Sequence, residues 1–517
     1  MQSGRSHDLF PSGLIDDGLL HRADRHSSRE ALADPSCKMN YGEVASTIRR
    51  LAGLLVRLGL SRGERVIVAL GNSVDQIIFH YAVLYAGGVV VPLSAGLPPG
   101  RLAFYIRDAE PMFIVSDEAD LFHAAPRTGD AWPSLITSGK RDKRALADLR
   151  DAAGEPEVQR NGLRKPSDLA ALLYTTGSTG QPKAVMLSHK NVTSALASII
   201  RFVGYGRSER ELVVLPVSHS FGLGHVYCNL TCGGFVRIDD GLKRLKRVLG
   251  ALVDDGITGF PCTPAMLQLL LGRYREAFTE RAKGLRFMVV NTAPLPPEVT
   301  SDLLSVLPDL RLLVYYGLTE ASRSTFIDLS AEGPERYRSV GPAASGVDIA
   351  IMSPEETPRP AGSEGEVWIR GEHLASGYWR REAETQASFA DGWLRTGDLG
   401  RMGEEGYLML TGRIGELINV GGLKVSPSEI ERIVGGHPAI ADAAAAEVKD
   451  PMGIRGSVVG VLVVVSDPGL KESDLRAFCA GQVESFMMPE VIRFAPSVPR
   501  AESGKILRSE VKALLEG

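Results

Sequence analysis

The chain has 517 residues, which is too many for a single hydrophobic core, so two or more domains are expected. Hydrophobic residues make up 44% of the sequence and charged residues 23%, as is ordinary for a globular protein. The formal net charge of -4 and the lack of a long basic run argue against a nucleic-acid-binding protein.

The cysteines and the apolar stretches of the sequence predict the cellular compartment. The 5 cysteines are scattered without a CxxC pair, which indicates a reducing compartment and no disulfide framework. Residues 1–20 lack the apolar core of a signal peptide. The most apolar stretch, residues 77–93, is interrupted by His80, Gly87, Gly88 and Pro92, so a buried helix and strand are predicted rather than a membrane span. We expect a cytoplasmic protein without a transmembrane segment.

Strands and helices alternate in the first part of the chain. Apolar residues at helical spacing predict helices over residues 41–58, 73–86 and 101–108. Continuous apolar runs predict strands over residues 65–70, 89–93 and 112–115. Residues 120–165 are polar and are predicted to be irregular. This alternation is typical of a parallel α/β sheet.

A loop rich in hydroxyl groups follows the next predicted strand, residues 169–174. Residues 175–183 (TTGSTGQPK) hold 4 hydroxyl side chains, 2 glycines and a lysine. Such a loop suits a polyphosphate, because hydroxyl and backbone N–H groups donate to phosphate oxygens and lysine adds positive charge. The loop is not of the Walker type, since Pro182 precedes Lys183 and Ala184 follows it.

The alternation of helices and strands then resumes. Helices are predicted over residues 191–202 and 242–254, and strands over 211–216, 233–238, 259–261, 287–290 and 311–316. Several of these strands end in polar or glycine-containing loops, including residues 218–222, 291–294 and 317–320. Ligands of parallel sheets bind at the carboxyl ends of the strands, so these loops are expected to converge on one crevice.

The pattern of predicted elements changes at about residue 347. Short strands at 348–352, 365–369 and 406–410 predict a small antiparallel, barrel-like subdomain. Residues after Arg413 predict an α+β unit with helices over 426–435 and 473–483 and a strand over 458–465. The predicted fold is therefore a large N-terminal domain (1–413), with two parallel-sheet α/β subdomains and the barrel-like subdomain, followed by a C-terminal domain (414–517).

Five motifs occur in an order that resembles the superfamily of adenylate-forming enzymes, which includes acyl-CoA synthetases, adenylation domains of peptide synthetases and luciferases. They are the loop at 175–183, YYGLTE at 315–320, WLRTGD at 393–398, the hinge segment that runs from GRIGELINVGG at 412–422 to EIE at 429–431, and PRAESGK at 499–505. The resemblance covers nearly the whole chain. It implies ATP-dependent conversion of a carboxylic acid into an acyl-adenylate, release of pyrophosphate, and transfer of the acyl group to a thiol.

The resemblance also implies roles for individual residues. The residues implied to bind ATP are Thr175, Thr176, Gly177, Ser178, Thr179, Gly180, Lys183, Tyr316, Asp398 and Arg413. Those implied to act in catalysis are Lys505, Glu320, Thr319 and His219. Glu320 suits Mg²⁺, a hard cation that prefers carboxylate oxygen. Lys505 is implied to bridge the substrate carboxylate and the α-phosphate, so the C-terminal domain would be a mobile lid with its hinge at Gly415.

The acid is less well defined than the nucleotide. The residues implied to line its pocket are His219, Ser220, Asn291, Thr292, Ala293, Tyr315, Gly317 and Leu318. Adenylation domains for α-amino acids usually place Asp where this chain has Ser220, and a buried ammonium without a carboxylate partner is costly. We therefore expect an aliphatic or aromatic carboxylic acid rather than an α-amino acid. Asn419 and Lys424 also depart from common family residues.

The acceptor of the acyl group is left open by the sequence. No carrier domain follows the lysine motif, so a separate acceptor is expected, either CoA, which is favoured, or the phosphopantetheine arm of a stand-alone carrier protein. Adenylation for a monooxygenase or lactone-forming step is an alternative. A degenerate binding protein is disfavoured by the intact Thr319, Glu320, Asp398, Arg413 and Lys505. A monomer and a homodimer are both compatible with the sequence.

Overall fold

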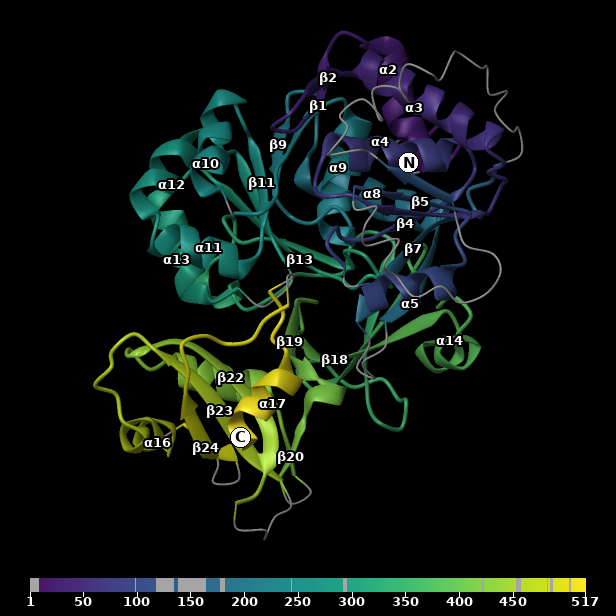
Figure 1. The fold of residues 1–517 in the computed structure, drawn as a ribbon. Helices are drawn as coiled ribbons and strands as arrows, with labels where there is room; N and C mark the ends of the chain where they lie inside the picture. The colour runs from purple at the N-terminus through teal and green to yellow at the C-terminus, as the bar shows by residue number, and fades with distance from the viewer. Residues whose placement is uncertain are drawn as a thin grey trace.

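The computed structural model describes residues 9–97, 99–117, 134–137, 164–176, 182–242, 244–291, 295–420, 423–451, 457–480, 482–483, 487–501 and 504–517. Figure 1 shows a large N-terminal part, coloured purple to green, and a smaller C-terminal part, coloured yellow-green to yellow. Among the predicted site residues, Gly177, Ser178, Thr179, Gly180, Thr292 and Ala293 lie outside the described residues. In the described ranges, no helix combines the length and the apolar character needed to cross a bilayer.

The first α/β subdomain contains a six-stranded sheet in the order β6-β5-β3-β4-β7-β8. All neighbours pair in parallel except β7 and β8, which are antiparallel. The strands are β3 (Arg65–Ala69), β4 (Val89–Pro92), β5 (Phe113–Ser116), β6 (Ser134–Thr137), β7 (Leu169–Thr176) and β8 (Pro182–Ser188). The helices are α3 (Tyr41–Arg57), α4 (Val74–Tyr85) and α5 (Pro99–Ala109). The predicted parallel sheet is confirmed, although β6 falls in the stretch predicted to be irregular.

The second α/β subdomain contains an eight-stranded sheet in the order β14-β13-β12-β11-β9-β10-β1-β2, parallel throughout except for the edge strands β14 and β2. Its strands are β1 (Glu30–Ala33), β2 (Lys38–Asn40), β9 (Arg210–Val213), β10 (Phe235–Ile238), β11 (Gly259–Cys262), β12 (Phe287–Val290), β13 (Arg311–Tyr316) and β14 (Thr325–Asp328). Its helices include α10 (Leu245–Asp254), α11 (Pro264–Gly272), α12 (Arg275–Arg281) and α13 (Pro297–Val306).

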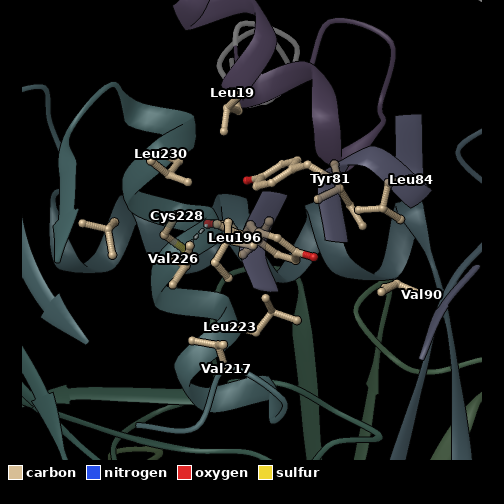
Figure 2. Close-up of a cluster of buried hydrophobic side chains, with 14 of the residues drawn as sticks. Leu19, Tyr81, Leu84, Val90, Leu196, Val217, Leu223, Val226, Cys228 and Leu230 are labelled. Carbon is tan, nitrogen blue, oxygen red and sulfur yellow. Dashed lines mark hydrogen bonds between the residues drawn. The ribbon is translucent and has the colours of Figure 1, made fainter. Parts of the chain in front are cut away.

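Three helices fill the space between the two large sheets: α2 (Ile15–Arg25), α8 (His189–Val203) and α9 (Ser220–Cys232). Figure 2 shows part of this core, in which Leu19 of α2, Tyr81 of α4 and Leu196 of α8 surround Val226 and Leu230 of α9. Helix α9 corrects the prediction of a loop over residues 218–222, because the helix begins at Ser220. Every residue from the second to the last of α9 is buried, so the sequence carries no amphipathic pattern that would reveal a helix.

The rest of the N-terminal part is an antiparallel five-stranded sheet, curled into a half-barrel, which confirms the predicted barrel-like subdomain. Its strands are β15 (Val347–Met352), β16 (Glu364–Gly371), β17 (Phe389–Ala390), β18 (Trp393–Met402) and β19 (Leu408–Arg413), with α14 (Glu382–Ser388) beside them. The sheet contributes β18 and β19 to the site described below.

The C-terminal part is an α+β unit with hydrophobic clusters of its own. It contains β20 (Ile418–Val420), β21 (Leu423–Val425), β22 (Ile440–Lys449), β23 (Ser457–Val465), β24 (Pro489–Phe494), α15 (Pro427–Gly435), α16 (Glu472–Ala480) and α17 (Arg508–Glu516). Strand β19 ends at Arg413, and the short 3₁₀ helix η3 (Ile414–Glu416) follows. The last strand of the half-barrel thus ends at the residue where the domain boundary is predicted.

Candidate active site

The two strands on either side of the predicted phosphate loop form a β-hairpin. Strands β7 and β8 pair antiparallel, with Thr175 opposite Lys183 and Thr176 opposite Pro182. A Walker loop instead connects a strand to a helix, whose N-terminus faces the phosphates. The hairpin geometry therefore explains why the sequence fails the Walker pattern, because no helix begins behind this loop until His189.

Tyr378, which belongs to none of the motifs, connects this hairpin to the YYGLTE segment. Its backbone forms a β-bridge with Val185 of β8, and Lys183 Nζ lies 5.3 Å from the centre of its ring. Its hydroxyl donates to Glu320 Oε1 at 3.0 Å. Burial and the adjacent Glu320 carboxylate raise the pKa of Tyr378, so the phenol keeps its proton and stays a donor to Glu320.

A tight turn at the carboxyl end of β13 presents Thr319 and Glu320. The Leu318 N–H donates to the Ala321 carbonyl at 3.0 Å, and the Ala321 N–H donates back to Leu318 at 3.2 Å. Gly317 is required here, because a Cβ at this position would lie 2.3 Å from the Arg323 nitrogen. Both predicted residues are half-buried, and they lie at the end of a parallel strand, where ligands of such sheets bind.

Glu320 is the residue predicted to bind Mg²⁺. Within the described ranges, no group of three or more His, Cys, Asp or Glu side chains could enclose a metal ion. Mg²⁺ usually takes one or two carboxylates, and its other ligands are water and substrate phosphate oxygens. A single carboxylate between the phosphate hairpin and the end of β13 fits that pattern.

Asp398 lies on β18 beside Arg413, its register partner on β19. The Tyr316 hydroxyl donates to Asp398 Oδ2 at 2.6 Å, and Arg413 Nε lies 3.4 Å from Oδ1. Burial raises the pKa of Asp398, whereas the Arg413 charge and the Tyr316 hydrogen bond counteract that rise. This arrangement leaves a carboxylate that can accept hydrogen bonds from two ribose hydroxyls. It also gives Tyr316 a function beyond its predicted contact with adenine, since Tyr316 orients Asp398.

The turn that carries Lys505 lies beside Glu416, next to the predicted hinge. The Gly504 N–H donates to the Ala501 carbonyl at 2.8 Å, and Gly504 has a φ of 83°. Lys505 Nζ lies 3.7 Å from Glu416 Oε1 and is half exposed, and its charge is close enough to lower the pKa of Asp398. The predicted catalytic lysine therefore lies beside Glu416, which follows Arg413 by three positions, and Arg413 pairs with the predicted ribose-binding carboxylate of Asp398.

Glu416 anchors Lys505 next to the predicted hinge. Its carboxylate also accepts from Arg508 Nε at 2.7 Å, and Arg508 Nη1 donates to Glu431 at 2.6 Å. Burial alone would raise the pKa of Glu416, but the hydrogen bond and charge of Arg508 lower it. A Cβ at Gly415 would meet no atom within 4 Å, and glycine adopts backbone angles that other residues avoid.

The described residues of the predicted acid pocket lie at the start of α9 and at the ends of β12 and β13. His219 is the N-cap residue and is exposed, which excludes a packed core histidine, and Ser220 is the first helical residue. Tyr315 is buried, which raises the pKa of its hydroxyl to about 12. Asn291 is half-buried at the end of β12, and Leu318 packs against the core of the half-barrel.

A narrow cavity of about 50 Å³ reaches this region from between α8 and α9. Figure 2 shows four of its apolar wall residues, Leu84, Val90, Leu196 and Leu223. The polar lining residues include Asn191 of α8, Ser220 at the start of α9, Thr319, Ser322 and Arg323 of the segment after β13, and His373 after β16. The sequence motifs do not single out Ser322, Arg323 or His373.

Comparisons with known proteins agree with this geometry. A family model described as AMP-binding enzyme matches residues 19–379, and one described as AMP-binding enzyme C-terminal domain matches residues 429–505. The chain belongs to the AMP-binding enzyme family. It is an adenylate-forming acid–thiol ligase, as the order of its motifs predicted.

Curated relatives and solved structures match over nearly the full length. The chain is 28% identical over 500 residues to the long-chain-fatty-acid–CoA ligase FadD13 of Mycobacterium tuberculosis, covering 96% of this chain and 97% of the relative. It is 30% identical over 531 residues to 4-coumarate–CoA ligase-like 9 of Oryza sativa subsp. japonica, covering 97% and 94%. The crystal structure of ATP-bound MatB from Rhodopseudomonas palustris superimposes with a TM-score of 0.88 at 28% identity, covering 97% and 99%.

Proposed function

We propose that the protein joins a carboxylic acid to coenzyme A through an acyl-adenylate. The observation that carries the proposal is the Asp398–Arg413 pair of the half-barrel, to which Tyr316 donates at 2.6 Å, together with Lys505 of the C-terminal part, whose amine lies 3.7 Å from Glu416, three residues after Arg413. A cation carried on a separate α+β unit suits a reaction in which two anions, a carboxylate and ATP, must be brought together.

In the first step the acid oxygen forms a bond to the α-phosphorus of ATP, and the bond from that phosphorus to the pyrophosphate oxygen breaks. Asp398 would hold the ribose, and Thr319 would donate to the α-phosphate. Lys183 and the hairpin hydroxyls would hold the departing β- and γ-phosphates. Lys505 would neutralise the negative charge that the carboxylate and the α-phosphate share.

Mg²⁺ bound at Glu320 would offset charge on the phosphates while the pyrophosphate leaves. Tyr378 supports this role, because its hydroxyl fixes one oxygen of the Glu320 carboxylate and leaves the other available. The ring of Tyr378 also packs against Lys183, so Tyr378 contacts both the phosphate hairpin and the proposed metal ligand.

In the second step the sulfur of a thiol forms a bond to the acyl carbon, AMP leaves, and the thiol gives up its proton. We propose CoA as the thiol because FadD13 and the 4-coumarate–CoA ligase-like protein are named as CoA ligases. A carrier-protein phosphopantetheine is the alternative, and the reacting thiol would be the same in both. Gly415 would permit the C-terminal domain to rotate. This rotation would remove Lys505 from the active site and admit the thiol.

The test is exchange of labelled pyrophosphate into ATP with a panel of acids, followed by mass analysis of the product with CoA or with an acylated carrier protein. We expect acid-dependent exchange and an acyl-CoA product. Absence of exchange with every acid would refute the proposed first step. Exchange with transfer only to a carrier protein would refute CoA as the acceptor.

A further inference from the structure

Arg323 is a buried cation on the loop that leaves the turn of Thr319 and Glu320. Its exposed fraction is 4%, and its backbone is in the left-handed region with a φ of 60°. The left-handed region is uncommon for a residue with a side chain, and the surrounding structure must hold it there. The loop thus turns the Arg323 side chain inward, where it lines the cavity.

Helix α9 and strand β13 leave room for the guanidinium group of Arg323. A Cβ at position 224 of α9 would lie 2.6 Å from Arg323 Nη2, so only glycine fits beside it. The ring of Tyr315, on β13, lies on another side with its centre 4.9 Å from Arg323 Cζ. Arg323 Nη1 donates to the Ser220 carbonyl at 3.1 Å, and Nη2 donates to the Phe221 carbonyl at 3.0 Å.

The charge of Arg323 has no counter-ion among the described residues, since no carboxylate of the described ranges comes within 4.0 Å of it. Glu211, a buried carboxylate in the same subdomain, accepts instead from Tyr205 at 2.9 Å and pairs with His225 at 2.7 Å. Arg323 Nε is buried and also has no hydrogen-bond partner. Burying a guanidinium without a counter-ion, and with its Nε unpaired, costs free energy unless a ligand supplies the missing acceptor.

The electrostatics of the cavity beside Arg323 favour an anion. The N-terminus of α9 begins at Ser220, and the positive end of its dipole adds to the charge of Arg323. Ser322, whose hydroxyl accepts from Arg323 Nη1 at 2.7 Å, and Ser220 supply neutral polar groups around it. Thr319, which lies where the reacting carboxylate is to be activated, lines the same cavity.

We propose that Arg323 is a specificity residue that binds a second acidic group of the substrate, so that the acid activated here is a dicarboxylic acid. This inference rests on the proposed function, because it assumes that the cavity beside Thr319 receives the acid. Guanidinium N–H groups pair with carboxylate oxygens through charge-assisted hydrogen bonds. The same cation would repel the ammonium of an amino acid, which agrees with Ser220 at the position where an aspartate would be needed.

The experiment compares acids that differ only in the second carboxylate: succinate with butyrate, glutarate with valerate, and adipate with hexanoate. For each pair, kcat/KM is measured by pyrophosphate release for the wild type, Arg323→Met, Arg323→Lys and Arg311→Met. Arg311 lies at the start of β13 and pairs with Asp328 away from the cavity, so its variant is the matched control.

We expect the wild type to prefer at least one diacid over its monoacid by about 10- to 100-fold, the range for a charge-assisted contact. Arg323→Met should remove this preference, Arg323→Lys should retain part of it, and Arg311→Met should retain all of it. The ratio of the two acids within one variant is the readout, because a loss of folding lowers both rates together.

Three outcomes would overturn the inference. The wild type could activate monoacids as well as diacids. Arg323→Met could lower both acids of a pair equally, which would assign Arg323 to the reacting carboxylate or to the support of α9. Arg323→Met could also keep the wild-type ratio. In each of these cases pyrophosphate release persists in the wild type and the proposed function stands, whereas no release with any acid would refute the proposed function itself.

Discussion

The hydrogen bond from Tyr316 to Asp398 makes ATP use sensitive to pH. Burial raises the pKa of Asp398, and the Tyr316 hydroxyl at 2.6 Å favours the ionised form. The ionised carboxylate is the form that can accept from both ribose hydroxyls, so ATP use should be lost as pH falls through the pKa of Asp398. Tyr316→Phe removes the hydroxyl and keeps the ring, so it should raise this pKa further.

The size of the shift follows from the strength of one hydrogen bond to a charged group. Such bonds contribute about 1.5–3 kcal/mol, and one pKa unit corresponds to about 1.4 kcal/mol. The Asp398 side chain is only 13% exposed, so solvent replaces little of the lost bond. In Tyr316→Phe, the pH below which kcat/KM for ATP falls should therefore be higher than in the wild type by about 1–2 pH units. Above that pH, the loss of kcat/KM should be smaller.

The assay is pyrophosphate release at saturating acid substrate, with kcat/KM for ATP measured across pH. Tyr315→Phe is the control, because Tyr315 is the neighbouring residue on β13 and makes no hydrogen bond to Asp398 in the structure. Thermal unfolding verifies that each variant is folded. An acid limb in Tyr316→Phe that coincides with those of the wild type and Tyr315→Phe would refute the assignment of Asp398 to ATP binding through its ionised form.

Three further predictions concern the C-terminal part. Lys505→Ala should nearly abolish pyrophosphate exchange yet still make thioester from supplied acyl-adenylate, and normal exchange would refute the lid argument. Gly415→Pro should leave adenylation largely intact and slow thioester formation, measured as acyl-CoA from supplied adenylate, because proline restricts the hinge. Arg508→Met should remove the ion-pair partner of the buried Glu431 and lower the free energy of unfolding, measured by urea denaturation, by about 3 kcal/mol. The control is Lys512→Met, which removes an exposed ion pair and should change the free energy of unfolding by less than about 1 kcal/mol.

The strands were predictable because of their composition. Continuous apolar runs such as those of β3, β4 and β13 are what a sheet covered on both faces requires, and the structure places each run in a strand. Helices with one apolar face, such as α3, were predictable for a similar reason. Helix α9 was not, because it is buried on all sides and its apolar residues follow no helical period.

The predicted site residues that the structure describes came from motifs, and motifs mark groups that face a shared ligand. Asp398 and Arg413 are neighbours on adjacent strands, and Lys505 lies beside Glu416, three residues after Arg413. Tyr378 and Glu416 act on these groups through packing and hydrogen bonds. Tyr378 lies outside the five motifs, and Glu416 lies inside one of them without a predicted role, so only the fold shows that Tyr378 supports Glu320 and that Glu416 holds Lys505.

Arg323 shows most clearly where sequence reasoning ended. The residue lies three positions after Glu320, where an arginine would ordinarily be taken as a solvated side chain. Its burial depends on a glycine one helix away and on a loop that turns inward, and neither is visible as a pattern. The nucleotide is the same for every member of such a family, so residues that bind it recur as motifs, whereas the acid differs from one member to the next. Determinants of the acid should therefore be sought among buried charged groups that lack a counter-ion, and within the described ranges Arg323 is such a group.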